Sequence, residues 1–215
     1  MKIPFRLTTV GSTLLLAAVQ SRAQSADKLY LDVSAGPAIT QDAAIKVSDF
    51  GNSGNVRFDV GPRIGLNLGY DLTPSFAAEL ESGMIWNGVR SIQPNNLSTF
   101  GASADIYEIP MLVNVIYKPL HGAFQPYVGV GCGGAATIFD SSNIPLYGPS
   151  FSATDWTFAY QAEVGFKYSV SRKVELGLAY KFLGTSDHDW TDAGHELKTD
   201  GTMTHAIMAT FTWQF

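Results

Sequence analysis

Residues that could carry acid–base or nucleophilic chemistry are few and widely spaced. The chain has four histidines and one cysteine, namely His121, His188, His195, His205 and Cys132. Nucleophilic catalysis needs a nucleophile and a base within hydrogen-bond reach. On an extended strand His205 shares its face with Met203 and Ile207, which are not nucleophiles, while Thr204 and Ala206 point the other way. The sequence therefore predicts no catalytic residue.

One segment combines carboxylates with imidazoles, which are ligands for divalent ions. It runs from Ser186 to Glu196. The sixth position of a calcium-binding loop is Gly, whereas the corresponding residue here is Asp192. We interpret the segment as an acidic, solvated loop and predict no metal site and no cofactor. Cys132 is interpreted as a small apolar residue, since a single Cys cannot form a zinc site or an internal disulfide.

Composition excludes several classes of protein. Of the 215 residues, 46% are hydrophobic, 15% are charged and 12% are aromatic. The charged fraction is low against the roughly 25% of soluble domains, so a heavily solvated surface is not expected. The aromatic content argues against disorder. A formal net charge of -5 argues against a nucleic-acid partner, because such proteins need a basic face.

The N-terminal segment has the three parts of a secretory signal peptide. Lys2 and Arg6 precede an apolar stretch at 7–19, and Ser21 and Ala23 are the small residues expected before a cleavage site. The stretch is shorter than the roughly 20 residues that a membrane-spanning helix needs. The sequence predicts a signal peptide at 1–23, export, and a single domain at 24–215.

The rest of the chain alternates with a period of two. Residues 56–70 and 156–170 each place apolar side chains on one face of an extended strand and polar or small ones on the other. Shorter copies of the pattern occupy 29–35, 76–86, 107–117, 128–138, 174–182 and 207–215. No segment has a convincing period of 3.6. We therefore predict eight strands and no helix.

The connections alternate in length as well. Those at 71–75, 118–125 and 171–173 are short, and those at 37–55, 87–104, 140–155 and 184–201 are long and polar. This is typical of an up-and-down barrel that carries all its long loops at one end. The sequence thus predicts an all-β fold, an eight-stranded antiparallel transmembrane β-barrel.

Strand length and side-chain volume decide which face points outward. Strands of 12 to 15 residues are longer than the usual 5–6 of soluble proteins and suit a tilted membrane strand. An eight-stranded barrel is just wide enough for its side chains to fill. The apolar face carries Trp86, Trp156 and Trp213, which would not fit inside. We expect the apolar face to contact lipid, as in membrane barrels and unlike lipocalins.

Charges of both signs lie on the polar face. Opposite charges on one inner wall can pair, which offsets the cost of burying them. We therefore predict an ionic plug instead of an open channel, made from Asp32, Asp59, Glu79, Glu81, Glu108, Glu163, Glu175, Arg57, Arg63, Lys167 and Lys181. The apolar stripes end in aromatics, which predicts two interfacial belts. One comprises Tyr70, Phe76, Tyr117, Tyr168 and Phe215, and the other Phe58, Trp86, Tyr107, Trp156 and Phe182.

Three stretches resemble a known family. They are Tyr107-Glu108-Ile109-Pro110-Met111-Leu112-Val113, Pro126-Tyr127-Val128-Gly129-Val130-Gly131, and the terminal Phe211-Thr212-Trp213-Gln214-Phe215. In order, they look like the strand-four, strand-five and C-terminal signatures of small bacterial outer-membrane barrels, the OmpA, OmpX and opacity-protein type, in the porin-like branch. Pro62 and Pro110 depart from an ideal ladder, because proline removes a hydrogen-bond donor, so we expect a bulge or open pairing there.

The resemblance implies a location and a set of partners. We expect a monomer in a Gram-negative-type outer membrane, in contact with lipid and lipopolysaccharide and assembled through recognition of Phe215. The leading interpretation is a non-enzymatic barrel whose four long loops act in structure, surface interaction or adhesion, with the extracellular ligand unknown. A narrow porin-like channel and a lipid A-modifying enzyme are the alternatives, since some barrels of this size are such enzymes.

Overall fold

The computed structural model describes residues 28–47, 52–94, 103–143, 151–192 and 195–215. The predicted signal peptide at 1–23 lies outside the described residues. Within the described ranges, no helix has the length and hydropathy needed to cross a membrane.

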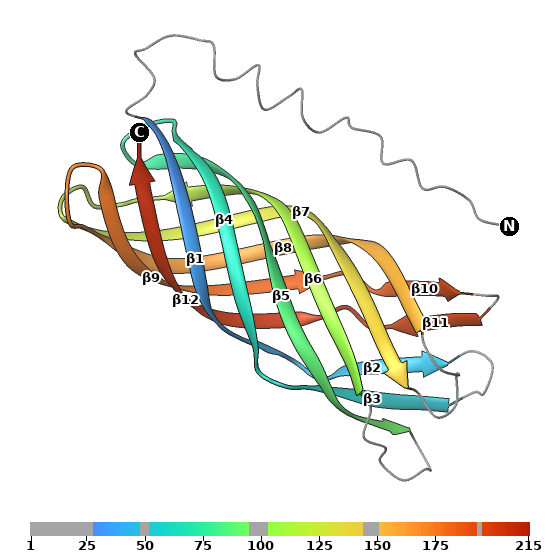
Figure 1. Ribbon diagram of the computed structural model, residues 1–215. Helices are drawn as coiled ribbons and strands as arrows, with labels where there is room; N and C mark the ends of the chain where they lie inside the picture. Colours follow the sequence, from blue (N-terminus) through green and yellow to red (C-terminus); the bar gives the residue numbers. More distant parts are fainter. Residues whose placement is uncertain (1–27, 48–51, 95–102, 144–150, 193–194) are drawn as a thin grey trace, which may run out of the picture.

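Eight antiparallel strands form a closed barrel (Figure 1). Each pairs with the next barrel strand along the chain, and the last pairs with the first, so the wall closes on itself. The up-and-down barrel predicted from the alternation is confirmed. The strands are β1 (Leu29–Thr40), β4 (Gly61–Asp71), β5 (Phe76–Pro94), β6 (Ser103–Tyr117), β7 (Phe124–Asn143), β8 (Phe151–Ser169), β9 (Val174–Thr185) and β12 (Met203–Gln214).

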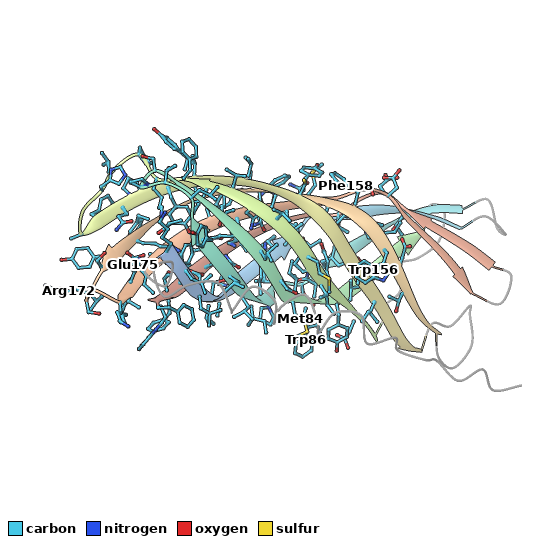
Figure 2. The ribbon with its side chains drawn as sticks, turned by 90° about the horizontal axis from the view of Figure 1, so that it is seen from above. Met84, Trp86, Trp156, Phe158, Arg172 and Glu175 are labelled. Carbon is cyan, nitrogen blue, oxygen red and sulfur yellow. The ribbon has the colours of Figure 1, made fainter. Side chains whose placement is uncertain are left out.

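The apolar face points outward, as predicted. Val113 is 55% exposed and Leu178 is 47% exposed, whereas Glu79 and Lys181 are 4% and 1% exposed. Figure 2 shows Trp86 and Trp156 projecting away from the barrel wall. In water these side chains would be an aggregation surface, because a contiguous apolar patch of this size is rare on soluble monomers. In a bilayer they contact hydrocarbon chains.

Aromatic side chains lie at both ends of the apolar band. Phe76 and Tyr117 are paired beside the short turns, with ring centroids 5.0 Å apart. Trp86 and Tyr107 stack at 6.0 Å toward the opposite end of the same two strands. These pairs occupy the two heights at which the sequence predicts interfacial belts.

The prediction of long loops is wrong for much of the chain that the structure describes in these segments. The segments 37–55 and 184–201 contain three further strands, β2 (Ala43–Val47), β10 (His188–Asp192) and β11 (His195–Thr199), and a fourth, β3 (Asn52–Phe58), begins in the first segment. They pair in the order β10-β11-β2-β3-β5 and form, with residues 89–94 of β5, what we call the outer sheet. Strands that extend beyond a bilayer need no lipid-facing apolar stripe, so hydropathy alternation does not reveal them.

The prediction of one continuous strand over 56–70 is also wrong. β3 ends at Phe58 and β4 begins at Gly61. The register with β5 shifts between Arg57 and Phe58, and the Asp59 backbone N–H donates to the Gly88 carbonyl at 2.9 Å. This irregularity separates the barrel from the outer sheet.

Both prolines interrupt a ladder, as expected. The β5–β6 pairing passes from Ser82–Met111 to Ile85–Glu108 without a partner for Pro110 on that side. The β4–β5 pairing begins at Arg63, so Pro62 lies just beyond its end. The missing proline N–H explains both gaps.

Candidate functional site: the charged barrel interior

Glu81 of β5 is the centre of the barrel interior. Its carboxylate accepts hydrogen bonds from Lys181 of β9 at 2.9 Å to each oxygen and from Arg63 of β4 at 3.1 Å. The amides of Gln161 on β8 and Asn114 on β6 donate to it at 2.6 and 2.8 Å. Side chains from five strands therefore meet at one carboxylate and cross the lumen.

A second carboxylate balances the charge of this cluster. Lys181 lies 3.3 Å from Glu163 of β8 as well as contacting Glu81, and all of these side chains are at most 3% exposed. Arg63, Lys181, Glu81 and Glu163 carry two charges of each sign. Pairing offsets the cost of burying these ions, although Arg63 Nη1 and Glu163 Oε1 have no hydrogen-bond partner within the described residues. The predicted ionic plug is confirmed for these four residues.

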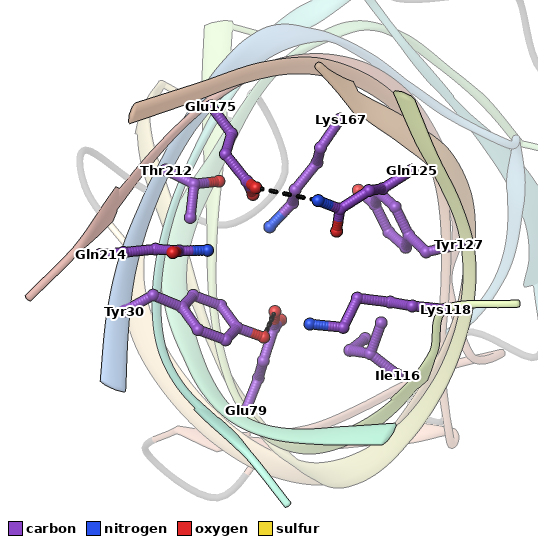
Figure 3. A pocket seen from close by; sticks show the side chains of 10 residues that line it. All are labelled: Tyr30, Glu79, Ile116, Lys118, Gln125, Tyr127, Lys167, Glu175, Thr212 and Gln214. Carbon is purple, nitrogen blue, oxygen red and sulfur yellow. Dashed lines mark hydrogen bonds between the residues drawn. The ribbon is translucent and has the colours of Figure 1, made fainter. Parts of the chain in front are cut away.

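A second layer of polar contacts lies nearer the short turns (Figure 3). The Tyr30 hydroxyl donates to Glu79 at 2.6 Å. Lys167 is 2.9 Å from Asp32, which also accepts from the Thr212 hydroxyl at 2.6 Å. The Lys167 ammonium lies 5.1 Å from the centre of the Tyr30 ring, within cation–π range.

Glycines on the inner wall make room for these layers. A Cβ on Gly69 would lie 2.1 Å from the Tyr30 ring, and one on Gly131 would lie 1.7 Å from the amide oxygen of Asn114. The small residues that the sequence places on the polar face are thus explained by crowding within a narrow barrel.

Little free space remains inside. The pocket at the short-turn end lies between Tyr30, Glu79, Lys118 and Lys167 and holds about one water molecule. Lys118 pairs with Asp71 at the same rim.

Arg57 and Glu108 depart from the predicted plug in different ways. Arg57 is wrong as a plug residue: it faces outward at the base of the outer sheet, 3.6 Å from Asp42, and both side chains are more than half exposed. Glu108 is buried as predicted, but its Oε1 atom has no hydrogen-bond partner within the described residues. The break at 59–60 moves Arg57 out of the barrel.

Three of the histidines have described partners. His121, at the short-turn end, lies 3.3 Å from the Ser75 hydroxyl. His205 lies on the outer face, hydrogen-bonded with the Tyr180 hydroxyl at 2.6 Å and the Gln41 amide at 2.8 Å, and neither partner is a serine, threonine or cysteine. Cys132 is exposed on the same outer face, as predicted.

His188 contradicts the prediction of a solvated loop. It begins β10 and is 1% exposed. Thr185 lies at hydrogen-bond distance, 3.2 Å, and Asp155 of β8 is 3.5 Å away. Burial lowers the pKa of His188, and the nearby Asp155 carboxylate opposes that shift. Across the described ranges, no three His, Cys, Asp or Glu side chains are grouped to hold a metal ion.

Sequence reasoning missed the inward aromatics. Tyr30 and Tyr127 are buried at 4% and 5% exposure and enclose Lys167. The alternation could have revealed them. Tyr30 is two residues from Asp32 and Tyr127 is two residues from Gly129, so each lies on the same, inward face of its strand as that neighbour.

Comparison with solved structures reveals the same fold at low sequence identity. OprG from Pseudomonas aeruginosa aligns with a TM-score of 0.56 and 19% identity over 89% of this chain and 99% of that one. AlkL, determined in lipid bilayers, gives 0.56 and 14% over 100% and 98%. The outer membrane protease OmpT from Escherichia coli gives 0.55 and 9% over 91% and 99%. At such identities the likeness shows the fold alone.

No curated protein matches the chain by sequence. The sequence profile of one family, described as the outer membrane protein beta-barrel domain, matches residues 11–215. The match spans nearly the whole chain and agrees with the lipid-facing exterior and the polar interior. The chain therefore belongs to the outer membrane protein beta-barrel domain family, and its membrane is the outer membrane.

Proposed function

We propose that the protein is a non-enzymatic surface protein in which a closed barrel holds the outer sheet rigidly above the membrane for contact with an extracellular partner. The observation that carries the proposal is the pairing of β11 with β2, in which Lys198 lies opposite Lys46 and Thr199 opposite Ile45. This pairing joins two hairpins from opposite ends of the chain into one surface.

The packed interior supports a role outside the lumen. Glu81 and its partners cross the barrel from wall to wall, so binding or transport inside would require these ion pairs to separate. The described partners of His205 on the outer face, Tyr180 and Gln41, include no serine, threonine or cysteine, which argues against a serine-type acyl-hydrolase site there.

Cell-surface binding tests the proposal. Cells that display the chain are compared with cells that display a variant in which residues 43–56 are replaced by a short turn, using laminin, fibronectin and collagen as immobilised probes. We expect binding to at least one probe, and its loss in the variant. Equal binding by the variant, or no binding at all by the intact chain, would contradict the proposal.

Two assays address the alternatives. In planar bilayers we expect no single-channel conductance steps, and discrete steps would instead favour a narrow channel. Lipid A from cells with and without the protein should have the same mass, and a mass difference would indicate a lipid A-modifying enzyme.

Export and assembly are part of the same proposal. Cleavage after Ala23 would leave a mature N-terminus at Gln24, which intact-mass measurement can read directly. In this proposal the assembly machinery recognises the terminal Phe215. The protein is a monomer in contact with lipopolysaccharide.

A further inference from the structure

Three exposed cations cluster on one side of the short-turn end. Arg172 and Lys173 lie in the turn between β8 and β9, and Lys28 precedes β1; we call these three residues the basic rim. All three side chains are exposed. In the described part of the chain, no carboxylate is recorded in an ion pair with them, whereas Lys118 at the same end pairs with Asp71. Figure 2 shows Arg172 at the tip of the barrel.

Backbone hydrogen bonds bring the basic rim together. The Gln214 N–H donates to the Lys173 carbonyl at 2.8 Å, and the Phe215 N–H donates to the Leu29 carbonyl at 3.1 Å. The end of β12 therefore lies between the β8–β9 turn and the start of β1. The carboxylates of Phe215 and of the buried Glu175 on β9 supply two negative charges against the three positive ones of the basic rim, so positive charge is in excess here.

Exposed apolar side chains border the basic rim. Trp213 is 43% exposed, Phe215 is 45% exposed, and Val170, two residues before Arg172, is 58% exposed. Cations beside outward aromatic and aliphatic groups lie at the level of lipid headgroups, with the apolar groups below them in the acyl region. At the opposite end the exposed Asp42 pairs with Arg57, and the other exposed charged side chains described there, Asp187 and Asp200, are acidic, so the charge of that end differs in sign from the basic rim.

From this arrangement we infer that the basic rim binds the headgroups of anionic phospholipids in the leaflet that faces the short turns. The phosphodiester and the net negative charge are the recognised features. The site is an electrostatic one, so it enriches anionic lipid locally around β9, β12 and β1 and weakens as salt increases. It goes beyond the proposed surface role and does not depend on it.

Lipid-selective fluorescence quenching tests the inference. In a variant that keeps only Trp213, with Trp86, Trp156 and Trp190 changed to Phe, the full chain is refolded into phosphatidylcholine vesicles that contain phosphatidylglycerol. Bromine is placed on the acyl chains of one lipid or the other. We expect the ratio of phosphatidylglycerol to phosphatidylcholine around Trp213 to be about two- to fivefold above bulk at low salt.

Two controls isolate the basic rim. Adding Lys28→Gln, Arg172→Gln and Lys173→Gln to the variant that keeps only Trp213 should bring the phosphatidylglycerol-to-phosphatidylcholine ratio near its bulk value. High salt should have the same effect on the variant without these three changes. A variant that keeps only Trp156, at the acidic end, should show no enrichment. Heat-modifiable electrophoretic mobility establishes that each variant is folded. The inference is overturned if the variant that keeps only Trp213 shows no enrichment, or if the triple substitution leaves the enrichment unchanged.

Discussion

At the scale of single residues, the interior is organised by the partners of its charges. Glu81 contacts two cations and two amides that come from four other strands. Glu175, by contrast, lies near the rim and is hydrogen-bonded by Ser169 and Gln125, which are neutral. The same substitution at these two carboxylates should therefore have different consequences.

Glu81→Gln should lower the free energy of unfolding by about 3–5 kcal/mol, because it leaves Arg63 and Lys181 as buried cations in excess. Glu175→Gln should cost less than about 1.5 kcal/mol, since an amide keeps its neutral partners. Urea unfolding in lipid vesicles, followed by tryptophan fluorescence, measures both. Equal losses would mean that Glu81 is not the centre of the plug.

Gly69 provides a test of crowding. Gly69→Ala should destabilise the barrel by about 1–3 kcal/mol, because its Cβ would displace the Tyr30 ring from Glu79. Gly88→Ala is the matched control: its nearest neighbour would be the Asp59 carboxylate at 3.9 Å, so little change is expected. If the same unfolding assay finds the two substitutions alike, the inner wall is less crowded than the structure indicates.

His188 gives the outer sheet a pH dependence. Because burial lowers its pKa in the folded chain, the unfolded chain binds more protons as pH falls below the ordinary value of about 6.5. Stability from the neutral imidazole is therefore present above about pH 6.5 and is lost as pH falls toward the lowered pKa. His188→Gln should flatten the dependence of unfolding free energy on pH between about 5 and 7. An unchanged pH profile in this variant would rule out His188 as its source.

At the scale of elements, a shift in strand register marks the boundary between the barrel and the outer sheet. The β1–β4 ladder runs without a shift from Leu29–Tyr70 to Ala38–Gly61, and the register with β5 shifts at the end of β3, between Arg57 and Phe58. Each barrel strand keeps two neighbours without β2 or β3. The barrel should therefore fold when that hairpin is absent.

Replacing residues 43–56 with a short turn should leave the heat-modifiable electrophoretic shift of the barrel intact. The reason is that the wall of eight strands, with its internal ion pairs, is complete below the break at 59–60. A chain that no longer shows the shift would mean that the outer sheet is needed for closure.

At the scale of the whole molecule, the lipid-facing orientation predicts a cost that depends on depth. Val113 lies between the two aromatic heights on β6, and Val170 lies at the short-turn rim. In vesicles Val113→Arg should cost about 2–4 kcal/mol and Val170→Arg about 0–1 kcal/mol, because only the first places a charge in hydrocarbon. Similar costs for both in the urea assay would argue against a bilayer around this band.

Much of the barrel follows from local pattern. Successive side chains of a strand point to opposite faces, so alternation around Val113 or Phe166 gives each residue its side. The alternation carries no information where both faces of a strand contact water, so it does not reveal β2, β10, β11 and the first half of β3. The alternation also cannot detect a register shift between strands, so it wrongly predicts that Arg57 lies inside the barrel.

The sequence by itself determined the number of barrel strands, the direction of side chains in the membrane band and the presence of opposite charges on the inner wall. Only the tertiary structure decided which charges pair. Glu81 and Lys181 are 100 residues apart, and their contact depends on the register of every strand between them and on closure of β12 against β1. A period of two is a property of neighbouring residues, whereas a partner across the lumen is a property of the closed ring.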